Sequence, residues 1–514
     1  MADFILAATP LAVIAQFLFA AWLAPRTSQS RGPASAVLTS SYVALGTAGL
    51  AAVALTSIGG LPIVDSLGWF RIDALSATML LLITFLGVVI LRFSRNYLDG
   101  DPERNPFLSR LCVALAAVVA LVTAENIAVL IIGWVATSLV VHRLLLHFPD
   151  RPRAQVAARK KFFFARTGDV LLIIAGLLMA SAFGTLSIST ILEVAKATPD
   201  LAARADVTLA CFCLAGAAML KCAQFPTHGW LTEVMETPTP VSALLHAGIV
   251  NAGGFILIRF SDVIVLSPGA MTALVIIGAF SAVFGAVVML TQTSVKGSLA
   301  HSTIAQMGLM LFQCGLGAFS AAALHLVAHS LYKAHAFLSS GRAVGSIAAR
   351  KPSLQPNALG VGIGLVGVLA LYLGVGALFA DSVTKSAGVV ALGAIFATGL
   401  FVYVVSVARI PGAFAIAIGV SLVGSFSYFT LQVAASTLLT GLVPVEPALG
   451  AWSAFVVGVA VAFFVAIALV QAGIIRSTDE LAQRAYVHLS RGLYANALND
   501  RLNSSLRLRH SNKA

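Results

Sequence analysis

Charged side chains are scarce in this sequence of 514 residues: they make up 10% of it, whereas 59% of the residues are hydrophobic. A soluble domain carries roughly 25% charged residues, so the deficit excludes a water-soluble globular protein. Apolar runs of about 18 residues or more recur along the chain, and each is long enough to cross a hydrocarbon layer of about 30 Å as a helix. The sequence therefore predicts an all-α polytopic membrane protein.

The sequence also lacks the motifs of a fuelled or redox enzyme. It has no Walker A motif, no glycine-rich dinucleotide fingerprint after a strand, and no cysteine run suited to an iron–sulfur cluster. Its five cysteines fall in or beside apolar runs, and Cys211 and Cys213 are too close together for a CxxC metal site. We therefore expect no cofactor in this chain, and a proton-translocating protein without its own energy source.

Hydropathy predicts about fifteen spans, with boundaries uncertain by several residues. They cover residues 5–23, 36–58, 75–93, 107–123, 127–146, 162–183, 207–225, 241–260, 271–290, 299–315, 320–338, 359–378, 389–408, 414–431 and 452–472. Basic residues gather in alternate loops, among them the stretch 151–161 after the fifth span. The positive-inside rule then places the N-terminus outside and the basic tail in the cytoplasm. The net charge of +12 is thus assigned to membrane topology and not to nucleic-acid binding.

The spans suggest five parts in the chain. We expect N-terminal transmembrane helices at 1–106, a first antiporter-like repeat at 107–260, a second, divergent repeat at 261–410, C-terminal transmembrane helices at 411–475 and a cytoplasmic amphipathic tail at 476–514. Related halves of this kind often place a transport site at their interface, beside helices broken by proline or glycine. The tail sequence "DELAQRAYVHLSRGLYANALNDRL" is typical of an amphipathic helix on a membrane surface or a partner.

Ionisable residues within the apolar runs are the most informative positions, because each costs about 2.5–3.5 kcal/mol at the bilayer centre and so faces a cavity or a partner. Lys221 lies in an apolar span, five residues before Pro226. The proline breaks the helix and leaves carbonyls free near the lysine. We interpret Lys221 as a proton carrier; the alternative is a lysine that reaches the interface by snorkelling.

A second cluster lies in "AAALHLVAHSLYKAHAF", where His325, His329 and Lys333 recur every four residues and so share one helix face. Imidazole both accepts and donates protons near neutral pH, which favours a proton relay. Structural hydrogen bonding is a second interpretation. A zinc site is a third, but no carboxylate or thiol close in sequence completes it.

Other polar residues are assigned smaller parts. His246 follows a hinge at Pro238 and Pro240 and is a further candidate proton station, as are Lys296 and His301 at the start of the tenth span. Residues expected to modulate these groups are Asp73, the pair Arg166 and Asp169 three residues apart, and Glu233 and Glu236 before the hinge. Glu125 is expected to be a solvated loop residue.

Two long stretches carry a family resemblance. "KCAQFPTHGWLTEVMETPTPVSALLHAG", and "SVKGSLAHSTIAQMGLM" followed by "HLVAHSLYKAHAFLSSG", resemble in order and spacing the signatures of the proton-conducting antiporter-like subunits of respiratory complex I and of Mrp antiporters. The resemblance covers roughly residues 70–345. It implies a helical bundle of roughly 13–15 transmembrane helices, with two inverted five-helix repeats and a broken helix in each. Lys221 matches the central lysine of the first broken helix, and the family's polar axis is matched by His246, Lys296, His301, His325, His329 and Lys333.

The sequence departs from this family at a position that matters for the lysine. The family places a glutamate directly after the Gly-Trp of the fifth helix, where it pairs with the central lysine; here Val135 follows Trp134. The later stretch that supplies a second channel lysine is also missing, and Lys385 is only a distant candidate. With "RPRAQVAARKKFFFARTGD" and "AYVHLSRGLYANALNDRL", these departures resemble the DabB-type membrane subunits of DAB inorganic-carbon accumulation complexes.

This second resemblance implies a division of labour between two subunits. A DabA-type peripheral partner on the cytoplasmic side, similar to a beta-type carbonic anhydrase, would hold zinc and hydrate CO₂. The present chain would be no enzyme; it would conduct a cation, the proton being favoured, and so drive hydration to bicarbonate in one direction. The alternatives are a proton-pumping subunit of a complex I-type oxidoreductase and a Mrp-type cation/proton antiporter subunit. Each predicts a multi-pass protein of the bacterial inner membrane.

Overall fold

The structure is a computed structural model that describes residues 2–26, 31–57, 63–65, 67–341, 358–379, 393, 414–445, 451–471, 480–497 and 501. It divides into two compact units. Unit 1 comprises Met1–Ala270, Leu326–Ser340 and Ala495–Ala514, and unit 2 comprises Met271–His325 and Gly341–Tyr494.

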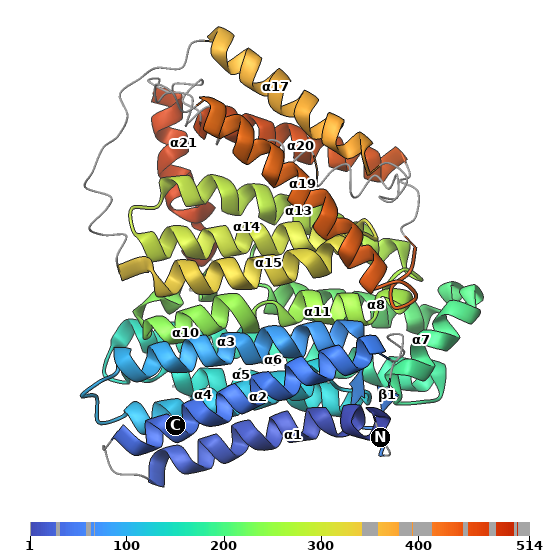
Figure 1. Cartoon of the computed structure of the whole chain (residues 1–514). Helices are drawn as coiled ribbons and strands as arrows, with labels where there is room; N and C mark the ends of the chain where they lie inside the picture. The colour runs from blue at the N-terminus through green and yellow to red at the C-terminus, as the bar shows by residue number, and fades with distance from the viewer. Residues whose placement is uncertain are drawn as a thin grey trace. The chain divides into compact units, whose positions relative to one another are not determined.

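Unit 1 is a bundle of helices with one small hairpin (Figure 1). Its helices are α1 (Ala2–Leu23), α2 (Arg31–Ser57), α3 (Ala74–Tyr97), α4 (Arg104–Val122), α5 (Ile127–Leu145), α6 (Pro152–Phe183), α7 (Ile188–Ala197), α8 (Ala205–Lys221), α9 (Gly229–Glu233), α10 (Thr239–Leu244), α11 (Ala252–Arg259) and α12 (Ser261–Ile264). The strands β1 (Ile63–Val64) and β2 (Arg71–Ile72) pair antiparallel. The long helices pack side by side, α1 against α2 and α4, and α6 against α8, because their apolar faces find partners only in one another or in lipid.

Unit 2 contains the helices α13 (Pro268–Thr291, from Met271 on), α14 (Val295–Gly315), α17 (Ala358–Ala377), α19 (Phe414–Leu438), α20 (Ala451–Gln471) and α21 (Glu480–Ser490). Helix α15 (Phe319–Leu338) contributes its first turns to unit 2 and the remainder to unit 1. Three glycines bring α13 and α14 into backbone contact: a Cβ added at Gly278, Gly285 or Gly308 would lie 2.6 Å from a backbone nitrogen of the facing helix. Small residues at such a crossing let the two helix backbones pack closely. This packing stabilises the helix pair in a membrane, where lipid is as apolar as the side chains and the hydrophobic effect does not drive helices together.

This crossing predicts the effect of adding one methyl group. In Gly285→Ala the new Cβ would meet the Ala305 backbone, which cannot move aside, so we expect overpacking to cost about 1–3 kcal/mol. Gly46→Ala is the matched control, since nothing lies within 4 Å of that position. Thermal denaturation of the detergent-solubilised protein measures both variants. Equal melting temperatures for the two would contradict the close crossing.

The predicted all-helical architecture is confirmed, and every predicted span within the described residues contains a helix. By length and composition, nine helices among the described residues can cross a membrane. The span predicted at 389–408 lies outside the described residues apart from Gly393, as does Lys385. One prediction was wrong: the basic stretch 151–161 is not a loop, because α6 already begins at Pro152. The amphipathic helix α7 and the hairpin were not predicted, since neither has the length of a span.

Candidate ion-conducting site

Lys221 is the last residue of α8, at the point where the helix breaks. The chain then turns through Ala223, whose φ of 51° is unusual for a residue with a side chain, and helix resumes at Gly229. Pro226 lies in this connection, after a cis peptide bond. Lys221 thus lies at a helix end, beside the break that Pro226 was expected to cause, where backbone carbonyls lack intrahelical partners.

The ammonium group of Lys221 lies over an aromatic ring. Its Nζ is 4.2 Å from the centre of the Trp134 ring, and Trp134 is itself buried in α5. Trp134 directly precedes Val135, the position at which the family resemblance calls for a glutamate. A cation–π contact provides a weaker electrostatic partner than a carboxylate. Among the described residues, the carboxylate whose charge acts on Lys221 is that of Asp169 in α6.

The Asp169 carboxylate interacts with Lys221 and also with Arg166, an arginine one turn earlier in α6. The structure contains the ion pair that the spacing allows: Arg166 Nη2 lies 2.6 Å from Asp169 Oδ2. Helix α6 approaches α8 closely here, because a Cβ added at Gly168 would lie 3.6 Å from the Cβ of Leu220. Lys221, Asp169 and Arg166 therefore form one electrostatic cluster between two packed helices.

Two adjacent lysines of α6 extend this region, although the sequence suggested only a basic loop. Lys160 forms an ion pair with Glu233 of α9. Lys161 instead donates hydrogen bonds to the carbonyl oxygen and the hydroxyl of Ser138, at 2.5 and 3.0 Å. Both lysines are 5% exposed. Glu233 thus engages a lysine of α6; Glu236 lies in a 3₁₀ turn (Val234–Glu236), and its side chain is outside what the structure describes.

His246 lies in a π-helical turn (Leu245–Ile249) between α10 and α11. Pro238 precedes α10 and Pro240 occupies its first turn, so the predicted hinge is present. The His246 ring stacks on Phe337 with centroids 4.2 Å apart, and the charge of Lys333 acts on it. Turns of this kind occur often at functional sites, because the wider coil frees backbone groups. The structure therefore brings His246 and Lys333 together, although they are far apart in sequence.

The remaining candidates lie on α14 and α15. His325 bridges two glutamines of α14: its Nε2 is 2.8 Å from Gln306 Oε1 and its Nδ1 is 2.9 Å from Gln313 Oε1. His301 Nδ1 lies 3.0 Å from the carbonyl oxygen of Gly297, one turn earlier. Lys296 is half-buried at the start of α14, and His329 is buried in α15. Gln306 and Gln313 are polar partners of the His325 ring that the pattern of titratable residues did not predict.

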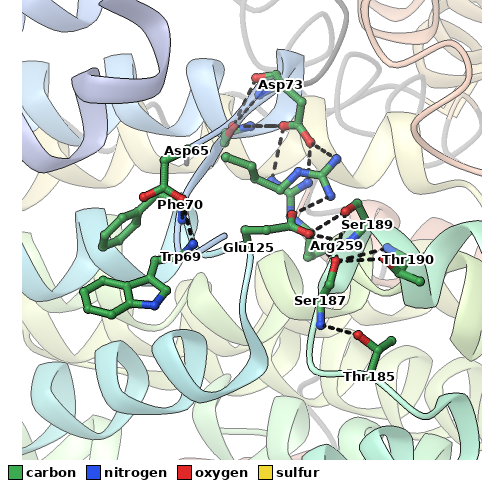
Figure 2. A network of polar contacts seen from close by, with 12 residues as sticks. Asp65, Trp69, Phe70, Asp73, Glu125, Thr185, Ser187, Ser189, Thr190 and Arg259 are labelled. Atoms are coloured by element: carbon green, nitrogen blue, oxygen red, sulfur yellow. Dashed lines mark hydrogen bonds and ion pairs between the residues drawn. The ribbon is translucent and has the colours of Figure 1, made fainter. Parts of the chain in front are cut away.

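A second polar centre, which the sequence did not reveal, joins five segments of unit 1 (Figure 2). Arg259 at the end of α11 makes a bidentate contact with Asp73, at 2.5 and 3.2 Å. Arg71 of β2 lies 2.8 Å from the same carboxylate and 3.4 Å from Glu125. All four side chains are at most 4% exposed. Two guanidinium groups and two carboxylates give a charge-neutral buried cluster, called here the Asp73–Arg259 network.

Glu125 is the clearest correction, since it was expected to be solvated and is 1% exposed. Its Oε1 accepts hydrogen bonds from the Ser187 hydroxyl at 2.7 Å and from the Ser189 backbone amide at 2.9 Å, at the start of α7. Its backbone pairs with Trp69 and Ile188. Asp73 also caps α3, accepting from the Ser76 amide at 2.8 Å. The described contacts of Asp73 therefore belong to this network and not to the Lys221 cluster.

Comparison with known proteins shows which family these features resemble. Residues 124–378 match the family described as NADH:quinone oxidoreductase/Mrp antiporter, TM, and residues 67–108 match the N-terminus of chain 5 of NADH-ubiquinone oxidoreductase (complex I). The chain is thus similar to antiporter-like membrane subunits over residues 67–108 and 124–378. A structure of the Mrp complex from Dietzia sp. DQ12-45-1b has the same fold, with a TM-score of 0.66 at 23% identity over 98% of this chain and 60% of that one.

Particular relatives are described as carbon transporter subunits. The chain is 47% identical over 286 residues to the probable inorganic carbon transporter subunit DabB of Hydrogenovibrio crunogenus, covering 55% of each chain. It is 41% identical over 346 residues to DabB2 of Halothiobacillus neapolitanus, covering 64% of this chain and 62% of the relative. It is 38% identical over 277 residues to NADH-quinone oxidoreductase subunit L of Mycobacterium tuberculosis, covering 53% of this chain and 43% of the relative. The matches thus span little more than half the length of the DabB-type relatives.

Proposed function

We propose that this chain is the cation-conducting membrane subunit of an inorganic-carbon uptake complex, and that the cation is a proton. The observation that carries the proposal is the 47% identity to a DabB subunit, together with a Lys221 cluster that lacks the acidic residue expected in complex I and Mrp subunits. Lys221, the His246–Lys333 neighbourhood and the glutamine-bound His325 are the stations through which protons would pass. The chain itself would catalyse no chemical step.

The coupling is proposed to run through a DabA-type partner on the cytoplasmic side. That subunit would hold a zinc ion and hydrate CO₂, and proton movement through the present chain would drive the reaction toward bicarbonate. The complex would lie in the bacterial inner membrane. The positive-inside rule supports a cytoplasmic C-terminal tail, because the basic loops and the tail fall on the same predicted side.

Replacing Lys221 tests the function. Co-expressed with its partner, the unaltered chain is expected to restore growth in air to a host that lacks carbonic anhydrase, and Lys221→Ala is expected to abolish that growth. The reason is that alanine cannot carry a proton across the helix break. Growth rate in air, compared with growth at elevated CO₂, is the measurement.

Arg159→Ala is the matched control, because Arg159 is exposed and contacts Gln155 one turn earlier on α6 instead of the Lys221 cluster. It should rescue as well as the unaltered chain does. Full rescue by Lys221→Ala would refute the proton path. Failure of the unaltered complex to rescue, combined with quinone-dependent or Na⁺/H⁺ exchange activity in membranes, would instead support a complex I-type or Mrp-type subunit.

A further inference from the structure

Among the residues that the structure describes, no carboxylate forms an ion pair with the buried ammonium group of Lys161. Its side chain is 5% exposed, and its hydrogen-bond acceptors are both on Ser138 and both uncharged. Burying an ammonium group is costly unless a carboxylate pairs with it. The neighbouring Lys160 is just as buried but has the carboxylate of Glu233 as its partner. The contrast between two consecutive lysines calls for a role for Lys161 other than anchoring α6.

Three cations compete for one carboxylate around Lys161. The charges of Lys221 and Arg166 act on Lys161 repulsively, and that of Asp169 acts attractively. Arg166 already pairs with Asp169 at 2.6 Å, and a guanidinium group does not lose its proton in a protein. The single negative charge of Asp169 is therefore largely compensated by Arg166. In a medium of low dielectric constant, Lys161 and Lys221 then titrate as a coupled pair. A proton on one of them disfavours a proton on the other.

We propose that Lys161 and Lys221 exchange a single transported proton, so that Lys161 serves as the second basic group of the conducting site. In this step an N–H bond of the Lys161 ammonium breaks as one forms on the neutral amine of Lys221, and the positive charge moves with the proton. The inference rests on the proposed function, since it assigns a new residue to the same proton path. It also explains how the path works without a glutamate at Val135.

The position of Ser138 supports this assignment. Ser138 lies three residues after Val135 and four after Trp134 on α5. Because Ser138 accepts from Lys161 and the Trp134 ring contacts the Lys221 ammonium, the two lysines meet α5 one turn apart on one helix face. A glutamate in place of Val135 would attract a proton to Lys221. The Lys161 ammonium group, held by Ser138, instead repels a proton on Lys221 and so favours its release. The hydroxyl of Ser138 can also donate and accept, and so can pass a proton.

A supply of protons lies one further turn along α5. His142 follows Ser138 by four residues and is half-buried, and the charge of Lys161 acts on it. Its Nδ1 is buried and makes no hydrogen bond among the described residues. A neutral imidazole can take a proton on one nitrogen and release one from the other. Lys161 thus has two exchangeable groups as electrostatic neighbours, His142 on α5 and Lys221 on α8.

The experiment compares three substitutions at one position in the complete complex. The chain and its partner are reconstituted in liposomes, a proton gradient is imposed, and flux is followed with an entrapped pH-sensitive dye. Lys161→Gln retains a donor to Ser138 but cannot exchange a proton, and Lys161→Arg retains both the donor and the charge. Because neither side chain can carry a proton, we expect both to lower flux about 100-fold, as Lys161→Met does.

A structural role would give a different pattern. If Lys161 only anchored α6 to Ser138, Lys161→Gln and Lys161→Arg would conduct like the unaltered chain and only Lys161→Met would fail, which would overturn the proposal. Arg159→Gln is the matched control on the same helix; Arg159 is exposed and should be replaceable without loss of flux. Gel filtration of each variant excludes misfolding. If Lys221→Ala also conducts normally, the proposed function itself is wrong, whereas normal conduction by the Lys161 variants alone overturns only this inference.

Discussion

Replacing Arg259 with leucine is expected to destabilise unit 1 by about 3–5 kcal/mol, the range found when one partner of a buried ion pair is removed. Burial alone would raise the pKa of the Asp73 carboxyl, but Arg259 and Arg71 outweigh it and hold the pKa below its usual range. The carboxylate therefore stays ionised at neutral pH. Without Arg259 the Asp73–Arg259 network would hold two carboxylates and one guanidinium group, and the excess negative charge would lie where exposure is at most 4%.

The expected loss is large because the network fixes several segments at once. Asp73 caps α3, Glu125 precedes α5 and holds the start of α7, and Arg259 ends α11. Thermal denaturation in detergent and the yield of folded protein are the measurements. The double variant Arg259→Leu with Asp73→Leu should recover part of the loss, because it removes the unpaired charge together with its partner.

An exposed ion pair of similar length provides the control. Arg204 Nη2 lies 2.6 Å from Asp206 Oδ2, but the two side chains are 47% and 31% exposed. Arg204→Leu should leave the melting temperature unchanged, since water replaces the lost contact. A melting temperature of Arg259→Leu equal to that of the unaltered chain would show that the network contributes nothing to stability.

The fold was largely predictable, because the bilayer imposes a simple rule on sequence. A helix must present about 20 apolar residues to lipid, so spans such as α3 and α13 are visible in composition alone. The start of α6 was misplaced because Arg153, Arg159, Lys160 and Lys161 interrupt the apolar run. A hydropathy profile counts those charges as solvent-exposed, whereas in the structure Lys160 and Lys161 are buried and pair with Glu233 and Ser138.

The polar networks were less predictable than the spans, for a physical reason. Arg71, Glu125 and Arg259 are far apart in sequence, and each alone has the pattern of a residue at the end of a span. Only tertiary packing brings them within hydrogen-bond distance. Local signals did identify pairs within one helix, such as Arg166 and Asp169, because helix geometry fixes neighbours three residues apart. Ser187 and Ser189, which bind Glu125 at the start of α7, lie 62 and 64 residues after it, so no local signal links them.

Lys333→Met is expected to reduce proton flux to the level of protein-free liposomes, provided that the proposed path is correct. Lys333 is fully buried in α15, and its charge acts on His246 in the π-helical turn. Methionine keeps the length and apolar stem of the side chain but cannot hold a proton, so packing against the neighbouring helices should survive. In the unaltered chain, Lys333 of α15 and His246 would transfer a proton between them. His246 lies in the wider π-helical turn, where backbone carbonyls are partly free.

His335 provides the comparison that makes this result interpretable. It lies two residues further along α15, on another face of the helix, and is exposed. His335→Met should conduct as the unaltered chain does, because an exposed imidazole away from His246 has no place in the path. If both variants conduct normally in liposomes, protons do not pass through Lys333, and its burial needs a structural explanation. If Lys333→Met alone fails while gel filtration shows a folded chain, the proton route includes α15, because the substitution removed the exchangeable group and left the shape of the helix unchanged.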